Sequence, residues 1–427
     1  MKKVCKRCIC IMLTFILFLS GLGYITNLTQ VKSTSISDLT YKSYFENPAE
    51  YDVLFLGTSH VMFGVYPMEL WRDYGITSYN WGSPTCTIPS VYWKLMNLLE
   101  YTTPKLVVVD CFRASWVDKV YDMERMHEAF DPFPLSVTKI KTVMDLMDDE
   151  QKFGDKDKGE ILFRLSAYHT RWEELGESDF KNSTVDKKGA EFQTDVEKPI
   201  TISHTEKKKT VTQDMEGVNY LKKLLEECRQ REIPVLLTYL PYPTSEEWKM
   251  EANMIQDIAD EYGVNYLNFT DLDVVDYNTD CSNEDSHLNP SGGRKVTKYL
   301  GDYIYTHYDI PCHQGDVENV TEWQERYDVY IDYKIALLKE EKVLKDYLML
   351  LNDNDLRSEI YINPNSKLFQ DEEIKRLINN IENGSCINDE NLDAEIMITV
   401  RNRYKNAIVD KVQFVKEEDY VKQDMDF

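Results

Sequence analysis

The sequence predicts an α/β fold with a doubly wound, flavodoxin-like parallel sheet of about five strands, a helical insertion and a small C-terminal α+β appendage. Two observations carry this prediction. Short apolar runs alternate with helical segments, which is typical of a parallel sheet covered by helices on both faces. The 427 residues, of which 42% are hydrophobic, also exceed what a single core usually supports. We therefore expect one large domain and a smaller second one.

The first predicted strand, 51–56, is a short apolar run that ends in Gly57. Four similar runs follow it along the chain. These other predicted strands are 76–80, 106–110, 235–240 and 264–269. The predicted helical segments are 58–74, which begins as a loop, then 90–101, 214–231, 245–262 and 294–305.

Two segments break the alternation. Residues 118–211 form a long, charged and mostly helical insertion, of the kind that decorates the carboxyl edge of such sheets. Beyond Cys312, a lysine- and glutamate-rich helical pattern covers 322–351, and 392–414 alternates like a hairpin around 403–406. The expected domains are an N-terminal segment (1–31), the α/β domain (32–312) and the C-terminal appendage (313–427).

The N-terminal segment combines a basic flank with an uncharged stretch, 8–31, that is long enough as a helix to cross roughly 30 Å of hydrocarbon. The positive-inside rule then predicts a single-pass membrane protein with a cytoplasmic N-terminus and an extracellular C-terminal domain. A cleaved secretory signal is the alternative, because small residues follow the apolar run. The basic residues are Lys2, Lys3, Lys6 and Arg7, and the small ones are Ser20, Gly21 and Gly23.

The formal net charge of −25 excludes a nucleic-acid binder as the default interpretation, because nucleic acid is held mainly by basic surface. An acidic surface also favours a neutral acceptor, or one captured where a local site near Arg171 reverses the sign. The six cysteines that follow the apolar helix show neither C-x-x-C pairs nor histidines at metal spacing. We expect no metal and no cofactor, and mostly buried free thiols, with a Cys281–Cys312 bridge as the alternative.

Ser59 is the first candidate for chemistry, because the strand 51–56 runs directly into Gly57-Thr58-Ser59-His60. A serine between a strand's carboxyl end and a helix projects into the crevice where open α/β sheets bind ligands. Serine is also a common helix N-cap, so this motif alone leaves both interpretations open.

His287 is the second candidate, on the polar loop 284–293 that precedes the last helix of the α/β domain. A carboxylate two or three residues before a histidine can orient its ring toward a nucleophile, as in a Ser-His-Asp arrangement. An exposed helix cap is the alternative for this loop alone. Because both signals fall at carboxyl edges of the same predicted sheet, their coincidence favours catalysis.

These residues resemble the SGNH/GDSL hydrolase superfamily over about 51–305. Gly57-Thr-Ser59 is similar to its first block, Asn80-Trp-Gly82 to its second and Asp285-Ser-His287-Leu-Asn to its last. The chain resembles most the membrane-anchored branch that includes the alginate O-acetylation and D-alanine transfer proteins. Two positions depart from the pattern. Thr58 stands where typical members have aspartate, and no Gly-x-Asn block follows 106–110.

The resemblance implies that Ser59 is the nucleophile, that His287 is the general base and then acid, and that Asp285 orients the histidine. Glu284 is the alternative acid, because many relatives place the carboxylate three residues before the histidine. The oxyanion hole would use the N–H groups of Ser59 and Gly82, with Asn80 in the same block. His169, Arg171 and Trp172 resemble a segment of the alginate-type members, and would form a substrate wall or a locally packed helix.

Two functions follow as expectations. The first is a serine-dependent O-acyltransferase or esterase that moves an acetyl or similar acyl group on a cell-surface polysaccharide or cell-wall polymer. Its acyl donor would be a multispanning membrane acyltransferase, because an acyl group delivered through the bilayer would emerge close to an anchored enzyme. The second is a non-catalytic, membrane-anchored assembly or carbohydrate-binding protein that retains the fold.

Overall fold

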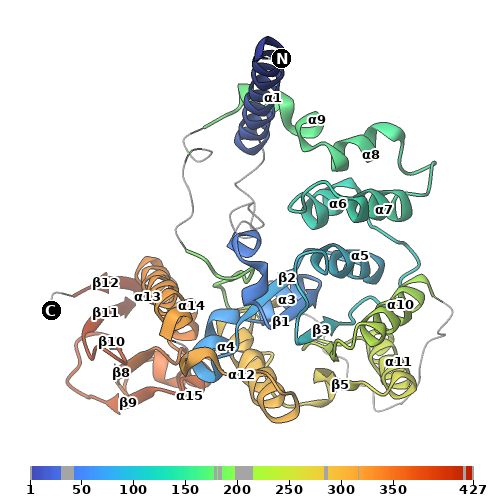
Figure 1. Ribbon diagram of the computed structural model, residues 1–427. Helices are drawn as coiled ribbons and strands as arrows, with labels where there is room; N and C mark the ends of the chain where they lie inside the picture. Colours follow the sequence, from blue (N-terminus) through green and yellow to red (C-terminus); the bar gives the residue numbers. More distant parts are fainter. Residues whose placement is uncertain are drawn as a thin grey trace.

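The chain folds around two separate five-stranded sheets, with one long helix at the N-terminus (Figure 1). The computed structural model describes residues 2–29, 43–176, 180, 185–197, 215–282, 287–315, 317–416 and 420–425. The long helix is α1 (Lys2–Thr29), and Figure 1 shows it beside the helix α9 of the insertion.

The first sheet has the order β2-β1-β3-β4-β5, and all of its neighbouring strands are parallel. This order confirms the predicted doubly wound, flavodoxin-like α/β fold. All residues of β1 to β4 are buried, as expected for parallel strands covered on both faces. The strands are β1 (Val53–Gly57), β2 (Ser78–Gly82), β3 (Leu106–Asp110), β4 (Val235–Tyr239) and β5 (Asn265–Asn268).

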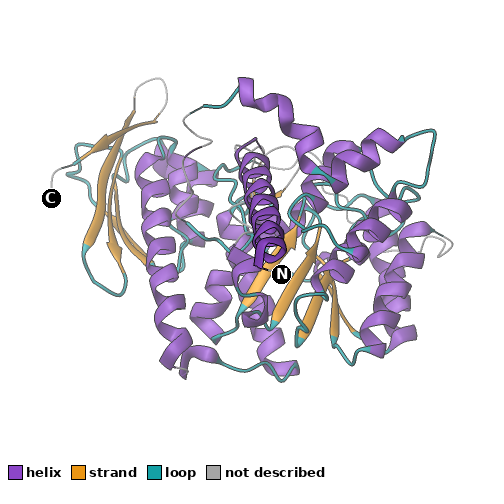
Figure 2. Cartoon of the chain, turned by 45° about the horizontal axis from the view of Figure 1, so that its top comes forward, coloured by secondary structure: helices purple, strands orange, loops and turns teal. Residues whose placement is uncertain are grey.

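Successive side chains of each strand enter different cores on the two faces of this sheet. Leu54 and Leu56 of β1 belong to the core formed with α5, α10 and α11, whereas Val53 and Phe55 belong to the core formed with α3 and α12. Figure 2 shows helices on both sides of the strands. The helices are α3 (Ser59–Gly64), α4 (Pro67–Tyr74), α5 (Ile88–Leu98), α10 (Glu216–Gln230), α11 (Glu246–Tyr262) and α12 (Pro290–His307).

Side-chain caps set where several of these helices begin. Thr87 accepts a hydrogen bond from the Ser90 N–H at the start of α5, and Ser245 accepts one from the Trp248 N–H at the start of α11. Such caps satisfy N–H groups that have no partner within the helix. The caps explain why the helices start close to the positions predicted from the sequence.

The predicted insertion contains helices up to Glu173, whereas its later stretch 185–197 contains none. It contains α6 (Met123–Phe130), α7 (Val137–Leu146), α8 (Asp155–Leu162), α9 (Arg164–Tyr168) and the 3-10 helix η2 (His169–Glu173), followed by the extended stretch 185–197. The rest of the predicted insertion, 177–179, 181–184 and 198–211, lies outside the described residues.

The second sheet has the order β12-β11-β10-β8-β9 and confirms the predicted C-terminal α+β region. The hairpin expected around 403–406 is the antiparallel pair β10 and β11, and the long helical pattern is divided into α13 and α14. Its elements are α13 (Val317–Glu340), α14 (Leu344–Leu350), β8 (Leu356–Ile362), α15 (Glu372–Asn380), β9 (Gly384–Asn388), β10 (Ile396–Asn402), β11 (Ile408–Lys416) and β12 (Tyr420–Asp424).

A buried ion cluster joins the two regions. Its cations are Arg72, Arg294 and Lys334, and its carboxylates are Glu69, Asp353 and Asp355. Arg294 of α12 lies 3.2 Å from Glu69 of α4 and 2.9 Å from Asp353. Lys334 of α13 lies 3.0 Å from Asp353 and also contacts Asp355. The cluster contains three cations and three carboxylates, so the formal charges of these buried side chains balance.

The cysteines of the described residues are free thiols, and Cys86, Cys111, Cys228 and Cys281 are buried, as expected. The alternative of a Cys281–Cys312 bridge is wrong, since Cys281 is buried and Cys312 is exposed as separate thiols. The buried cysteines pack in the cores as small apolar side chains, which explains their burial.

We expect Asp355→Ala to destabilise the protein by about 3–5 kcal/mol, because it removes one carboxylate from beside Lys334 and Arg72 and leaves the buried cluster with more cations than carboxylates. Burial alone would raise the pKa of Asp355, but the charges of Lys334 and Arg72 outweigh it and hold that pKa well below its usual range. The stabilisation is therefore present above the unfolded-state value of about 4 and is lost as the pH falls further.

Urea unfolding of the purified protein, at neutral pH and in acid, measures this effect. The control is Asp332→Ala, which removes the same charge from an exposed position of α13. Equal stability losses in the two variants at neutral pH would contradict the role of the cluster.

Candidate active site

Ser59 and His287 meet at the carboxyl edge of the first sheet. The Ser59 Oγ lies 2.8 Å from the His287 Nε2, although 228 residues separate them in the sequence. Ser59 is the first residue of α3, directly after β1. His287 lies on β7 (His287–Leu288), which pairs with β6 (Cys281–Ser282) just before α12. At this distance the serine hydroxyl can donate its proton to the imidazole, as a nucleophile and its base require.

Asp285 and Glu284, the two candidates for orienting the histidine, fall within 283–286 and lie outside the described residues. Their order of preference stays a prediction. Among the described residues, no group of three or more histidine, cysteine, aspartate or glutamate side chains could hold a metal ion.

Gly57 allows the chain to turn sharply from β1 into α3. A Cβ at this position would lie 2.6 Å from Val61 Cγ2 and 2.8 Å from Asp110 Cβ, so a side chain has no room. Thr58 follows as the N-cap of α3, and its Oγ1 accepts a hydrogen bond of 3.2 Å from the His60 N–H. Thr58 therefore serves to start α3, the helix that carries Ser59.

Asn80 and Gly82 hold α3 against β2. The Asn80 Nδ2 donates to the carbonyls of Val61 and Val65, at 2.7 and 2.8 Å, and its Oδ1 accepts from the Gly82 N–H at 2.9 Å. A Cβ on Gly82 would lie 2.6 Å from the Met62 nitrogen. Two of the donors predicted for the oxyanion hole, the Gly82 N–H and the Asn80 amide, thus already have protein acceptors, and an oxyanion would have to share or displace them. The oxyanion role of Ser59, Gly82 and Asn80 stays a prediction.

Asn289 fixes the hairpin that carries His287. Its Oδ1 caps α12 by accepting from the Gly292 N–H, and its Nδ2 donates to the carbonyls of Thr279 and Cys281 at 2.9 and 3.1 Å. The end of β7 and the start of α12 are held by one side chain. The histidine therefore does not depend on its own loop alone for its position.

Aromatic rings surround the pair. The His60 ring stacks on Tyr242 at 4.8 Å, lies 4.3 Å from Phe112 and meets His287 edge-on at 5.7 Å. Burial first, and then the charges of His287 and Arg113, hold the pKa of His60 well below its usual range. His60 is therefore neutral at neutral pH. The sequence contains no periodic signal for this cluster, because its rings come from α3 and from the ends of β3 and β4.

Arg113 is the residue that sequence reasoning missed. It follows β3 and has a left-handed backbone, with φ of 69°, although it is not glycine. The buried Glu251 carboxylate holds this turn by accepting from the N–H groups of Arg113 and Ser115, both at 2.8 Å. The guanidinium stacks over Trp116 at 3.9 Å, and its Nε and Nη1 are buried without a hydrogen-bond partner among the described residues. A strained residue beside a sheet edge is a sign of function that only the backbone reveals.

Asp110, at the end of β3, forms a hydrogen bond that holds the sheet together. Its Oδ1 accepts from the Leu240 N–H at 2.9 Å, which ties the ends of β3 and β4 together. Burial raises the pKa of Asp110 to about 7 in spite of its backbone hydrogen bonds. A carboxyl group in this position stabilises the sheet edge on which the pair lies.

The stretch 185–197 of the insertion crosses the same edge. The Asn80 N–H donates to the Lys188 carbonyl at 2.9 Å, the Glu191 N–H donates to the Met62 carbonyl at 2.9 Å, and the Glu197 N–H donates to the Cys281 carbonyl at 3.0 Å. This stretch therefore connects β2, the helix of Ser59 and the hairpin of His287. The insertion reaches the candidate site, as such insertions usually do.

His169, Arg171 and Trp172 lie on η2, which contacts α1. The Arg171 Nη1 donates to the Thr29 carbonyl in the last turn of α1 at 2.8 Å, and 64% of the Trp172 surface is exposed. The segment is thus attached to the end of the N-terminal helix. Its role as a substrate wall stays a prediction.

The helix α1 is apolar enough to cross a membrane or to be a signal sequence. Its segment Ile9–Thr26 has a mean hydropathy of 2.2 and is not buried against the rest of the described chain. These properties are compatible with the predicted single-pass anchor.

Comparisons with known proteins add little. No family model matches the chain, and no curated protein does. Among solved structures, a protein of Bacteroides fragilis NCTC 9343, provisionally assigned as an acylhydrolase, is 9% identical. It aligns over 62% of this chain and 93% of its own, with a TM-score of 0.32. A gut microbial diltiazem-metabolizing enzyme is 12% identical over 60% of this chain and 48% of its own, with a TM-score of 0.20.

Proposed function

We propose that this protein is a serine-dependent O-acyltransferase or esterase with Ser59 as nucleophile and His287 as base. The observation that carries the proposal is the 2.8 Å contact between the Ser59 Oγ and the His287 Nε2. Two groups so distant in sequence come within hydrogen-bonding distance at the edge where open α/β sheets bind their ligands. The SGNH-type fold and mechanism stated above as a resemblance fit this geometry.

The chemistry follows from that contact. As the Ser59 Oγ attacks the acyl carbonyl, His287 takes its proton, and the carbonyl oxygen becomes an oxyanion. The C–O bond to the leaving group then breaks, and the leaving oxygen takes the proton from His287. The acyl group remains on Ser59 as an ester. In the second half, His287 takes the proton of an acceptor hydroxyl or water, which attacks this ester. The bond between the acyl carbon and the Ser59 Oγ then breaks, and His287 returns the proton to the Ser59 Oγ.

The acceptor proposed is a hydroxyl of a cell-surface polysaccharide or cell-wall polymer. Anchoring by α1 would hold the enzyme on the outer side of the membrane, where a multispanning acyltransferase could supply acyl groups. Transfer rather than hydrolysis requires that water be excluded. Two features beside Ser59 support the exclusion of water. One is the group of stacked rings of His60, Phe112 and Tyr242, and the other is the stretch 185–197, which crosses the sheet edge.

Arg113 would supply positive charge near the oxyanion, in place of the asparagine that the third block lacks. Its stacking partners include Phe112, at 5.6 Å, whose ring contacts His60 beside Ser59. Its two buried nitrogens without partners leave the guanidinium with unused donors. A preformed cation at this edge stabilises charge that develops only during the reaction.

A fluorophosphonate probe tests the nucleophile. We expect the wild-type protein and a Ser166→Ala control, altered at an exposed serine of the insertion, to be labelled equally. Ser59→Ala should not be labelled, because the probe reacts with the activated hydroxyl. If wild type and Ser59→Ala are both labelled, or neither is, the assignment fails. Absence of labelling in the wild type favours the non-catalytic alternative, an anchored assembly or carbohydrate-binding protein.

The acceptor is tested with an activated acetyl ester and an oligosaccharide. We expect acetylated sugar to form at the expense of free acetate as the oligosaccharide concentration rises, since both acceptors compete for one acyl-enzyme. Mass spectrometry of the sugar and an acetate assay measure the partition. Free acetate alone, at every acceptor concentration, would limit the protein to esterase activity.

Arg113→Ala should lower kcat/KM for the activated ester by at least about tenfold, because a donor to the transition state is removed. Labelling by the fluorophosphonate should persist, since Ser59 and His287 keep their contact. Arg229→Ala, which removes the same charge from an exposed position of α10, is the control. An unchanged kcat/KM in Arg113→Ala would refute the role of this cation.

A further inference from the structure

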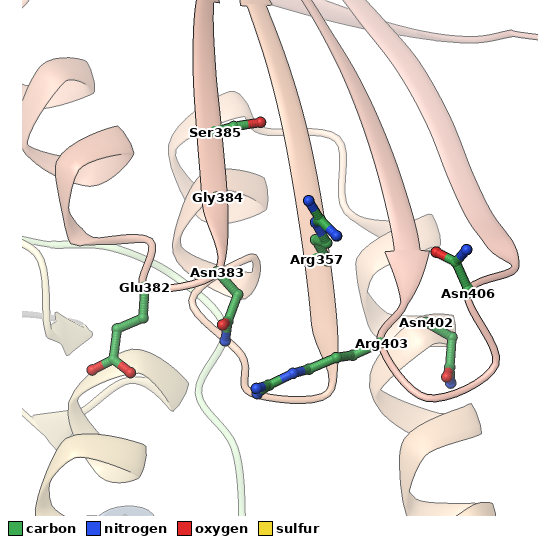
Figure 3. A pocket seen from close by; sticks show the side chains of 8 residues that line it. All are labelled: Arg357, Glu382, Asn383, Gly384, Ser385, Asn402, Arg403 and Asn406. Atoms are coloured by element: carbon green, nitrogen blue, oxygen red, sulfur yellow. The ribbon is translucent and has the colours of Figure 1, made fainter.

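The turn between β10 and β11 borders a polar cavity of about 310 Å³ on the C-terminal sheet. Its walls come from β8, from the start of β9 and from this turn. Figure 3 shows Arg403 reaching past the start of β8 toward Asn383. The residues that matter here are Arg357, Asn383, Ser385, Asn402, Arg403 and Asn406.

The cavity is positively charged although the chain as a whole is acidic. The stretch 396–409 contains three basic residues, Arg401, Arg403 and Lys405, and no acidic one, in a chain with a net charge of −25. Arg401 is the cross-strand partner of Arg357, so both side chains lie on one face of the sheet. Like charges opposite each other are unfavourable unless an anion joins them.

No carboxylate of the described residues forms an ion pair with Arg357, Arg401 or Arg403. Glu382, at the rim, lies 3.8 Å from Lys298 of α12, and Figure 3 shows it pointing away from both arginines of the cavity. The Glu382 carboxylate thus pairs with Lys298 and not with an arginine of the cavity, so it does not neutralise these arginines.

The polar groups of the cavity are held in place. The Arg403 Nη1 donates to the Asn354 carbonyl at 3.2 Å, and the Asn383 Nδ2 donates to the Asn354 Oδ1 at 3.2 Å. Asn402 is only 4% exposed. Its Oδ1 accepts from the N–H groups of Tyr404 and Lys405, which leaves its Nδ2 without a partner among the described residues. A ligand would meet arginine and amide donors together with amide and hydroxyl acceptors.

A second cavity, of about 450 Å³, lies on the other side of the same turn and shares Asn402. Tyr404 and Lys405 line it, and 60% of the Tyr404 surface is exposed. An exposed tyrosine beside a polar cavity is a surface on which a sugar ring can stack. The two cavities therefore offer neighbouring positions to consecutive units of one chain.

We propose that the cavity at Arg357 and Arg403 binds an anionic unit of a glycopolymer, with the next unit against Tyr404. Arginine forks match the oxygens of carboxylates and phosphates, and a cavity of this size accommodates one small polar unit. The shared chemistry is an oxyanion on a hydroxyl-rich chain, either a uronate carboxylate or a phosphodiester. The site stands on its own contacts and does not depend on catalysis by Ser59.

Binding of defined polymers to the full chain in detergent tests this site by calorimetry. The ligands are oligogalacturonate, which carries carboxylates, poly(glycerol phosphate), which carries phosphodiesters, and neutral dextran. We expect wild-type protein to bind at least one anionic polymer and not dextran. The polymer that binds identifies the anion. The double variant Arg357→Ala/Arg403→Ala should weaken binding at least tenfold.

Arg376→Ala is the matched control, because it removes one arginine from an exposed position of α15 outside the cavity, and it should bind as wild type does. Ser59→Ala should also bind fully, which separates failure of this site from failure of the proposed function. Thermal unfolding verifies that the double variant is folded. Binding of neither anionic polymer by wild type, equal binding by the double variant, or an equal loss in Arg376→Ala would each overturn the proposal.

Discussion

The direction of the five parallel strands is the constraint on which the rest of this molecule depends. Strands that run the same way end at the same edge, so the residues that follow them are brought together whatever their distance in sequence. Ser59 follows β1, Arg113 follows β3, and Tyr242 follows β4. The hairpin of His287 comes after β5. Because both faces of the sheet are buried, a shift of register would move every side chain into the wrong core.

Close approach of backbones then brings these residues to hydrogen-bonding distance. Gly57 and Gly82 let α3 press against the ends of β1 and β2, and the amide of Asn80 holds it there. Polar side chains in this layer serve first to shape the site. Asn289 likewise has two structural roles, because its amide group both caps the start of α12 and fixes the preceding hairpin. The serine hydroxyl meets the imidazole because these contacts leave α3 little freedom.

Sequence reasoning reached the central fold and the pair because each depends on local signals. Strand 106–110 is found with the bounds expected, since an apolar run flanked by polar residues marks a buried strand. The strands β8, β9 and β12 were not expected, because their pairing is long-range and their apolar patterns are short. Arg113 belongs to no motif, and its signal is a backbone angle. The Asn80 amide donates to the carbonyls of Val61 and Val65, and the spacing of these residues in the sequence does not predict these hydrogen bonds.

Helix α13 belongs to both regions, and this decides how the chain can be divided. Trp323 is 1% exposed, stacks on Trp71 at 5.9 Å and lies 4.7 Å beneath the Lys188 Nζ, so the first half of α13 completes the core of the α/β domain. Leu338, near its other end, belongs to the core of the second sheet. A chain ended at residue 312 would expose the surface that Trp323 covers. Because α13 contributes to both cores and the ion cluster joins residues on both sides of it, exchange of the C-terminal region between related proteins would have to include matched changes in this helix.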